Sequence, residues 1–246
     1  MRLAILSDIH SNLPALEAVL AEVDKDPPDE TWCLGDVVGY GAEPNECTRA
    51  VTERARVCLA GNHDLAALDA LDISSFSPAA AEAARWTREQ LEPETREYLT
   101  GLEAADESRE VAIYHASPRD HVWEYVLWPD QAGECIARQA TRIALVGHSH
   151  VALSFRASDD GELDATQGAQ MSADSTLELQ EGRWLLNPGS VGQPRDGDAR
   201  AAWMELDTEK WTATYRRVDY PIEREADAIA AAGLPEHLGR RLFAGQ

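Results

Sequence analysis

Aspartate, asparagine and histidine recur in five short motifs along this chain of 246 residues. The motifs are Asp8-x-His10, Gly35-Asp36, Gly61-Asn62-His63-Asp64, the single His115, and Gly147-His148-Ser149-His150. They offer only nitrogen and oxygen donors, and imidazole combined with carboxylate is typical of sites for Mn, Fe, Zn or Ni. The four cysteines fit no zinc-binding spacing and are predicted to be free thiols. The motifs together therefore predict a site for divalent metal ions.

The number of candidate ligands exceeds the needs of one ion. The candidates are Asp8, His10, Asp36, Asn62, His115, His148 and His150. In an extended stretch, alternate side chains point to the same side, so both ends of a DxH or HxH motif can reach one ion. Each motif alone is weak, because Gly-Asp turns and DxH loops are common. Seven ligands are too many for one tetrahedral ion, but they fit two ions that share a bridging carboxylate.

The motifs follow predicted β-strands. Apolar runs in the first half predict five strands, over 2–7, 31–35, 56–60, 110–114 and 142–146. Helical spacing and start signals predict helices between them, over 13–23, 44–51, 78–91, 93–102 and about 130–139. In α/β sheets, ligands bind at the carboxyl ends of the strands. We therefore expect successive strands to deliver the motifs to one edge.

The second half of the chain has a different pattern. Short runs, several of them alternating, predict strands over 151–156, 175–180, 183–187, 201–206 and 212–218. Glu181-Gly182 lies between two of these runs, which predicts a hairpin turn and an antiparallel portion of sheet. The 157–174 segment is rich in Ser, Asp, Gly and Gln and is the candidate mobile loop. A helical tail is predicted over 222–243, with a break near 233–235.

The order of the motifs, DxH, GD, GNH(D/E), H and GHxH, resembles that of the calcineurin-like metallophosphoesterases. HASPRDHVWEYV (115–126) and NPGSVGQPRDGD (187–198) resemble a bacterial branch described as YfcE-like or diadenosine-tetraphosphatase-like. The resemblance covers about residues 2–206. It implies an α/β fold, a four-layer α/β/β/α sandwich of two mixed sheets. We predict a single domain over 1–246, made of this motif-bearing core and the helical tail.

The resemblance also implies a role for each motif residue. Asp8, His10 and His150 would hold one divalent metal ion, Asn62, His115 and His148 a second, and Asp36 would bridge the two. His63 would be the catalytic histidine, as general acid or transition-state stabiliser, and Asp64 would support it. Two such ions lower the pKa of a shared water and orient in-line attack on phosphorus. The implied activity is hydrolysis of a small phosphate ester by a phosphodiesterase or phosphatase, with manganese among the candidate metals.

Other polar and aromatic positions near the motifs have two interpretations each. Arg195, in the 187–198 loop, is a candidate substrate contact or a surface arginine. Asn12 is a candidate substrate contact or a helix cap, and capping is the commoner role of asparagine before a helix. Trp123, Tyr125 and Trp128 could stack on an aromatic leaving group, or pack in the core or in a dimer contact. Homo-oligomerisation therefore stays open.

Charge and composition limit the partners. A net charge of −22 argues against binding of nucleic-acid polymers, which depends on Lys and Arg contacts to phosphates. No run of 18 or more apolar residues is present, which argues against a membrane span. The N-terminus is typical of a first strand rather than a signal peptide, and we predict a cytoplasmic protein. The expected partner is a small phosphate ester.

Three alternative functions fit the sequence less well. A non-catalytic scaffold of the same fold would be expected to lack the catalytic histidine or some ligands, whereas His63 and all seven ligands are present. Ser/Thr protein phosphatases carry GDxVDRG at the second motif, and here Gly39 and Tyr40 replace the second aspartate and the arginine. A nuclease would be expected to carry a basic stripe, which this acidic sequence lacks.

Overall fold

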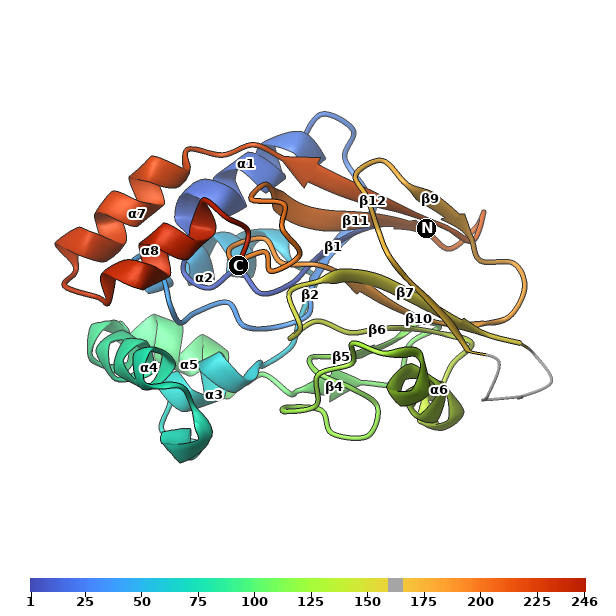
Figure 1. Ribbon diagram of the computed structural model, residues 1–246, viewed down its shortest axis with the longest axis horizontal. Helices are drawn as coiled ribbons and strands as arrows, with labels where there is room; N and C mark the ends of the chain where they lie inside the picture. The colour runs from blue at the N-terminus through green and yellow to red at the C-terminus, as the bar shows by residue number, and fades with distance from the viewer. Residues whose placement is uncertain (159–165) are drawn as a thin grey trace.

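Two mixed sheets of six strands each pack face to face in a computed structural model that describes residues 1–158 and 166–246 (Figure 1). The first sheet has the order β3-β2-β1-β11-β12-β9. Its strands are β1 (Arg2–Leu6), β2 (Glu30–Cys33), β3 (Val57–Cys58), β9 (Thr176–Glu178), β11 (Ala201–Asp207) and β12 (Thr212–Val218). The second sheet has the order β4-β5-β6-β10-β7-β8. Its strands are β4 (Ala105–Asp106), β5 (Ala112–Tyr114), β6 (Ile143–Leu145), β7 (Ala152–Ala157), β8 (Gln167–Gln170) and β10 (Arg183–Pro188).

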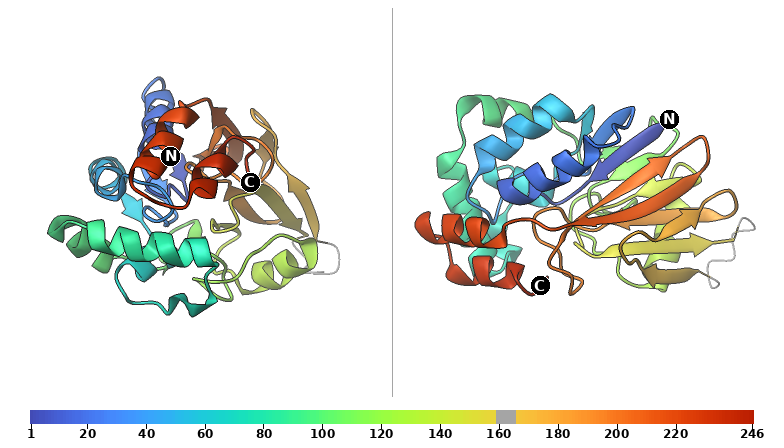
Figure 2. Two further views of the ribbon diagram at one scale, coloured as in Figure 1. Left: turned by 60° about the vertical axis from the view of Figure 1, so that its left-hand side comes forward. Right: turned by 90° about the horizontal axis from the view of Figure 1, so that it is seen from above.

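Helices cover the outer faces of both sheets, which completes the predicted four layers. The first sheet packs against α1 (Leu13–Val23), α2 (Pro44–Arg54) and α5 (Pro93–Thr100), and the second against α6 (Pro129–Arg138). The remaining helices are α3 (Asn62–Ala67), the 3-10 helix η1 (Ile73–Ser75), α4 (Pro78–Gln90), α7 (Ile222–Ala231) and α8 (Glu236–Leu242). Figure 2 shows α1 and α6 on opposite outer faces of the paired sheets. None of the helices in the described part of the chain is long and apolar enough to cross a membrane.

Strand β1 illustrates why the sheets stack. Leu3 and Ile5 point into the layer between the sheets, whereas Ala4 and Leu6 face the helices. This alternation follows from the period of two along a strand. Because both faces are buried, the strand is apolar throughout, and each fully buried leucine or isoleucine contributes roughly 1.5–3 kcal/mol. All four cysteines are free thiols, as predicted.

Parallel pairing aligns the strand ends that carry the motifs. β1 pairs in parallel with β2, and β2 with β3, so Leu6, Cys33 and Cys58 lie side by side near the carboxyl edge of the first sheet. In the second sheet, β5 pairs in parallel with β6, and β6 with β10. The predicted delivery of the motifs to the carboxyl ends of strands is therefore confirmed.

The predicted hairpin at Glu181-Gly182 is wrong. β9 pairs with β12 in the first sheet, whereas β10 pairs with β6 and β7 in the second. The short connection between them therefore crosses from one sheet to the other. The antiparallel portion of sheet is present, but it is formed by other pairs, such as β11 with β12 and β7 with β10.

Part of the predicted mobile loop is regular structure. Gln167–Gln170 forms strand β8, which pairs antiparallel with β7. Strand β7 extends to Ala157, and residues 159–165 of the predicted loop lie outside the described residues. The helical tail is present as α7 and α8, and the predicted break contains Gly233 with a φ of 72°. The two helices pack on each other and on α4 through Ile229, Leu238 and Ala83.

Candidate metal centre

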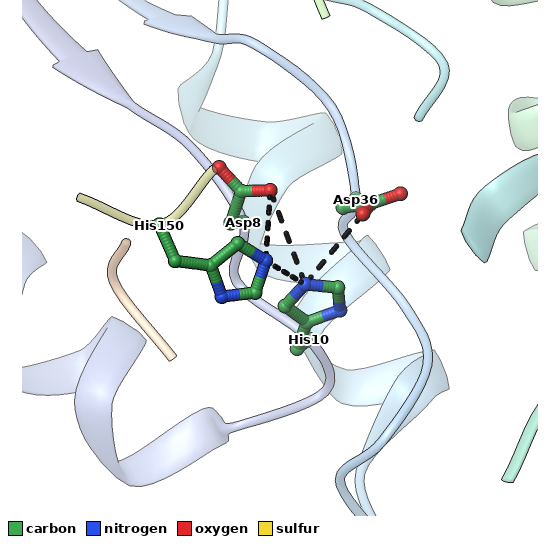
Figure 3. Close-up of side chains that lie close together, drawn as sticks. All are labelled: Asp8, His10, Asp36 and His150. Carbon is green, nitrogen blue, oxygen red and sulfur yellow. Dashed lines mark hydrogen bonds and ion pairs between the residues drawn. The ribbon is translucent and has the colours of Figure 1, made fainter. Parts of the chain in front are cut away.

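The predicted ligands meet between the carboxyl edges of the two sheets. Two groups of side chains each bring their ligand atoms within 4.8 Å of one another. The first group is Asp8, His10, Asp36 and His150, and the second is Asp36, His115 and His148. Figure 3 shows the first group, with its four side chains pointing toward one another. Asp36 belongs to both groups, so the two candidate sites are neighbours. Asn62, the seventh predicted ligand, places its Oδ1 3.2 Å from His115 Nε2.

Unusual backbone conformations aim these side chains inward. Five of the seven predicted ligands have left-handed φ angles between 51° and 62°, namely Asp8, His10, Asp36, His148 and His150. Aspartate and histidine tolerate this region better than most residues. Adjacent glycines allow close approach: a Cβ at Gly61 would lie 2.0 Å from Asp36 Oδ1. The turns after the strands are thus shaped to place polar atoms at one point.

Each of the four predicted ligand histidines has one ring nitrogen against a backbone carbonyl. The pairs are His10 Nδ1 with Val38 (3.2 Å), His115 Nδ1 with Leu34 (2.9 Å), His150 Nδ1 with Gln193 (2.7 Å) and His148 Nε2 with Trp123 (3.2 Å). A carbonyl oxygen only accepts hydrogen bonds, so the facing nitrogen carries the hydrogen. The other nitrogen keeps a lone pair, which is how such partners prepare histidine to bind a metal.

The inward-facing atoms are therefore almost all acceptors. His10 Nε2 and His150 Nε2 are 3.0 Å apart, with a lone pair on each. Asp8 Oδ1 and Asp36 Oδ2 are buried, and among the described residues neither has a hydrogen-bond partner. They lie 3.4 Å from His150 Nε2 and 3.5 Å from His10 Nε2, respectively. Lone pairs this close repel one another, and a cation between them removes the repulsion. The residues present thus fit a metal ion.

The second group has the same character. His115 Nε2 lies 3.6 Å from Asp36 Oδ2, so Asp36 faces both groups. The ring of Tyr125 stacks on that of His148, with 4.1 Å between the centroids. The donor set is imidazole, carboxylate and amide oxygen, which suits first-row divalent ions.

Burial shapes the ionisation of the site. Desolvation raises the pKa of Asp8 to about 7 and, with the nearby charge of Asp64, raises the pKa of Asp36 well above its usual value. Desolvation also lowers the pKa of His10, His148 and His150 well below the usual histidine value. The protein alone therefore disfavours charge on every one of these groups. A bound dication would favour ionised carboxylates and keep the imidazoles neutral as ligands.

His63 lies beside the ligands, on the first turn of α3. Its ring contacts those of Tyr40, Phe76 and His10, with centroid distances of 4.3, 4.8 and 4.9 Å. Its backbone N–H donates to Asp36 Oδ1 at 2.8 Å. A Cβ at Gly39 would lie 2.7 Å from His63 Nδ1, so only glycine leaves room for the ring there. The structure brings His63 to the centre, and its catalytic role stays a prediction.

The structure does not place Asp64 against the ring of His63. Its Oδ1 accepts from the N–H of Val38 at 3.0 Å, and its Oδ2 from the N–H of Gly61 at 2.9 Å. Both oxygens therefore hold backbone around the site, and the predicted support of His63 by Asp64 stays a prediction. The sequence motif places the two residues together, but their side chains point to different neighbours.

Asn12 is a helix cap, the commoner of its two predicted roles, and its contact with a substrate stays a prediction. Its Oδ1 accepts from the N–H of Ala15 at 3.1 Å, which caps α1. Its Nδ2 donates to the carbonyl of Gly192 at 2.8 Å and lies 3.3 Å from the Tyr220 hydroxyl. The side chain is buried with its polar atoms in use, so it cannot meet a substrate without breaking these bonds.

Arg195 lies next to a predicted metal ligand in the chain's fold. Its backbone N–H donates to the carbonyl of His150 at 3.1 Å. Its Nη2 donates to Gln193 Oε1 at 2.7 Å and lies 3.4 Å from the Tyr40 hydroxyl. After burial, the charge of Arg195 is the largest cause of the lowered pKa of His63 and of His150. Its contact with a substrate stays a prediction.

Aromatic side chains form a wall next to His63 and His148. The ring of Phe76 lies between those of His63 and Trp123, with centroid distances of 4.8 Å and 5.6 Å, respectively. Trp128 is 68% exposed, so it is not part of the core. Sequence reasoning missed Phe76, which lies in an irregular segment without a motif. It also missed the part that the Trp123 carbonyl plays in orienting His148.

Comparison with known proteins agrees with this geometry. Residues 1–209 match the family described as the calcineurin-like phosphoesterase superfamily domain. The chain belongs to this superfamily. The matched residues include all seven predicted ligands and His63, whereas α7 and α8 lie beyond them.

Two relatives match this chain over nearly its whole length. An uncharacterised protein of Methanocaldococcus jannaschii is 36% identical, over 99% of this chain and 98% of its own. The crystal structure of a metallophosphoesterase from Sphaerobacter thermophilus has a TM-score of 0.90 at 38% identity, and the match covers 100% of this chain and 99% of the other. A local match, 40% identical over 65 residues, links 25% of this chain to 24% of a symmetrical bis(5'-nucleosyl)-tetraphosphatase of Actinobacillus pleuropneumoniae.

Proposed function

We propose that this chain is a hydrolase of small phosphate esters that depends on two divalent metal ions. The observation that carries the proposal is the buried set of unpaired acceptor atoms around Asp36. One ion would be held by Asp8, His10, Asp36 and His150. The other would be held by Asp36, Asn62, His115 and His148. Membership of the phosphoesterase superfamily supports the same reading.

When bound, the ions would activate a water molecule and offset charge on the phosphoryl oxygens. The residues of the chain would supply the remaining roles in the reaction. Asp36 would hold both ions at a fixed separation. Its Oδ1 also accepts from the N–H of His63, so the same side chain would hold the metals and position the catalytic histidine. Nδ1 of His63 is buried beside Gly39, so Nε2 would be the nitrogen that faces a substrate. That atom would donate a proton to the leaving oxygen or stabilise its charge.

The substrate class follows from local charge rather than from the whole surface. The chain carries 44 acidic and 22 basic residues, which disfavours a polyanionic polymer. Surface charge is screened beyond about 8 Å at physiological salt. Two divalent ions together with Arg195 would therefore attract a small phosphate ester locally. The local match to a symmetrical tetraphosphatase supports nucleotide esters as substrates to test first.

The test is a panel of phosphate esters assayed with Mn, Ni, Mg and Zn, alongside metal analysis of the purified protein. We expect metal-dependent hydrolysis of at least one monoester or diester, and none after treatment with a chelator. The protein should bind two ions for each chain. A chain that takes up no manganese and hydrolyses nothing would instead support the non-catalytic scaffold.

A further inference from the structure

Tyr40 is an aromatic residue of the site that belongs to none of the five motifs. Its ring lies against two site histidines, with centroid distances of 4.3 Å to His63 and 4.8 Å to His10. The guanidinium carbon of Arg195 lies 5.7 Å from the centroid of the same ring. The side chain is half-buried, so part of it is open to a ligand. Packing accounts for the ring of Tyr40, but it does not require the hydroxyl, which phenylalanine lacks.

The backbone holds Tyr40 in a conformation that bulky residues rarely adopt. Its φ is 58°, in the left-handed region. A Cβ at Gly39 would lie 2.7 Å from His63 Nδ1. One at Gly41 would lie 2.5 Å from the carbonyl oxygen of His10, which instead accepts from the N–H of Gly41 at 3.0 Å. The turn is thus fixed against both histidines, and strain that is fixed in this way is common at functional sites.

The hydroxyl of Tyr40 has one hydrogen without an acceptor. Arg195 Nη2 lies 3.4 Å from the hydroxyl oxygen, and a guanidinium can only donate. The oxygen is therefore the acceptor, and its own hydrogen is left to donate to another group. In the described ranges, 1–158 and 166–246, no residue accepts that hydrogen. Arg195 is itself held by Gln193, whose Oε1 accepts from the same Nη2 at 2.7 Å. Burial raises the pKa of the Tyr40 hydroxyl, so it remains a donor near neutral pH.

We propose that the Tyr40 hydroxyl donates a hydrogen bond to a non-bridging phosphoryl oxygen of the bound ester, and that Arg195 positions this hydroxyl. The inference rests on the proposed function and adds a substrate-binding residue to it. A phosphoryl oxygen carries negative charge, so it accepts such a bond strongly. The non-bridging oxygens stay on phosphorus throughout hydrolysis, so the contact would exist before and during the reaction. It would therefore contribute to substrate binding rather than to turnover.

The experiment compares the wild type with Tyr40→Phe and Arg195→Gln, and Tyr98→Phe is the matched control. Tyr40→Phe removes only the hydroxyl and keeps the ring. Tyr98 is a half-buried tyrosine of α5 that packs against the core on the helix-covered face of the first sheet. Orthophosphate is titrated by calorimetry into each manganese-loaded protein. Bis(p-nitrophenyl) phosphate and p-nitrophenyl phosphate are assayed for kcat and KM, and metal analysis compares the manganese content of the proteins.

We expect Tyr40→Phe to bind orthophosphate about tenfold more weakly, because a hydrogen bond to a charged group contributes about that much. KM for the hydrolysed ester should rise by a similar factor, with kcat and manganese content within about twofold of the wild type. Tyr98→Phe should match the wild type. In the Arg195→Gln background, the hydroxyl is no longer positioned. The further change Tyr40→Phe should then weaken orthophosphate binding by less than about threefold.

The outcomes separate this inference from the proposed function. Equal orthophosphate affinity in Tyr40→Phe and the wild type would overturn the contact, and ester hydrolysis by the same wild type would leave the enzyme in place. A fall in kcat without a change in affinity would also overturn it, because the hydroxyl would then act on His63. A full tenfold loss from Tyr40→Phe in the Arg195→Gln background would overturn the positioning by Arg195. Weaker binding by Tyr40→Phe, in a protein that hydrolyses no ester with any metal, would support the contact and refute the enzyme.

Discussion

Two neighbouring regions of the site have opposite hydrogen-bonding character. The ligand groups around Asp36 present acceptor atoms, and several of these lie within 4 Å of one another without a donor between them. Arg195, beside these groups, has a guanidinium that presents only donors. A protein interior that gathers like groups in this way needs a ligand of the opposite kind at each place. In the proposed function, the cations would occupy the first region and the phosphate ester would lie against the second.

The two regions also differ in how the chain builds them. The acceptors come from strand ends in both sheets, within the residues that match the superfamily. Arg195 lies in the loop after β10. The Gly197 N–H of this loop donates to the carbonyl of Gly245, in the segment after α8 and beyond that match. The predicted ligands thus lie at the ends of the sheet strands, and the C-terminal segment lies against the loop that carries Arg195.

Replacement of Asp36, which both predicted ligand groups share, should have the largest effect on metal binding and activity. Asp36→Asn removes a charge from both ligand groups, so we expect occupancy of both metal sites to fall together. Activity should drop on the order of 10³-fold or more, because metal charge contributes several kcal/mol to catalysis. Metal analysis and steady-state kinetics measure the two effects. Asp227→Asn, an exposed change on α7, is the matched control. If both metal sites stay fully occupied in Asp36→Asn, Asp36 does not bridge the two ions.

Replacement of His63 should affect turnover alone. His63→Ala leaves every predicted ligand in place, so the metal content should match that of the wild type. We expect kcat to fall by about 10²–10⁴-fold, the range typical of a lost general acid. Steady-state kinetics with metal-saturated protein measure this fall in kcat. If turnover stays undiminished, the acceptor region works without His63 and the assigned role is wrong.

A buried carboxyl tests how α7 and α8 dock. Glu225 of α7 is buried, its Oε1 accepts from the N–H of Ala42 at 3.3 Å, and burial raises its pKa well above the usual value. The folded protein therefore retains a proton that the unfolded chain loses above about pH 4.5. The stabilising contribution of Glu225 is complete below that pH and is lost as the pH rises through the folded-state pKa.

Glu225→Gln should therefore change the pH dependence of stability. The variant should gain stability over the wild type as the pH rises from 5 to 8, by roughly 1.4 kcal/mol for each unit of pKa shift titrated. Denaturant unfolding at both pH values measures the gain. Glu223→Gln, an exposed change on the same helix, should behave as the wild type. Identical pH profiles for the wild type and Glu225→Gln would show that Glu225 is ionised in the folded state.

Sequence reasoning reached the acceptor region because its signals are local. A ligand such as His148 follows its strand within a few residues, next to a glycine that permits the turn. Arg195 has no such signal, since its loop position fits a substrate contact and a surface arginine alike. The wrong hairpin at Glu181-Gly182 has a similar cause: a turn pattern does not reveal that the next strand joins another sheet. Asn12 had two plausible uses, and only the contacts of its amide decide between them.

The left-handed backbone at five of the predicted ligands has a consequence for metal uptake. Holding a residue other than glycine in that region costs on the order of 1 kcal/mol or more, and the surrounding sheets supply this energy as the chain folds. An incoming ion would then meet side chains that already converge, with little conformational entropy left to lose. Capture should be governed by how fast the ion sheds its water, so ions that exchange water rapidly would load first.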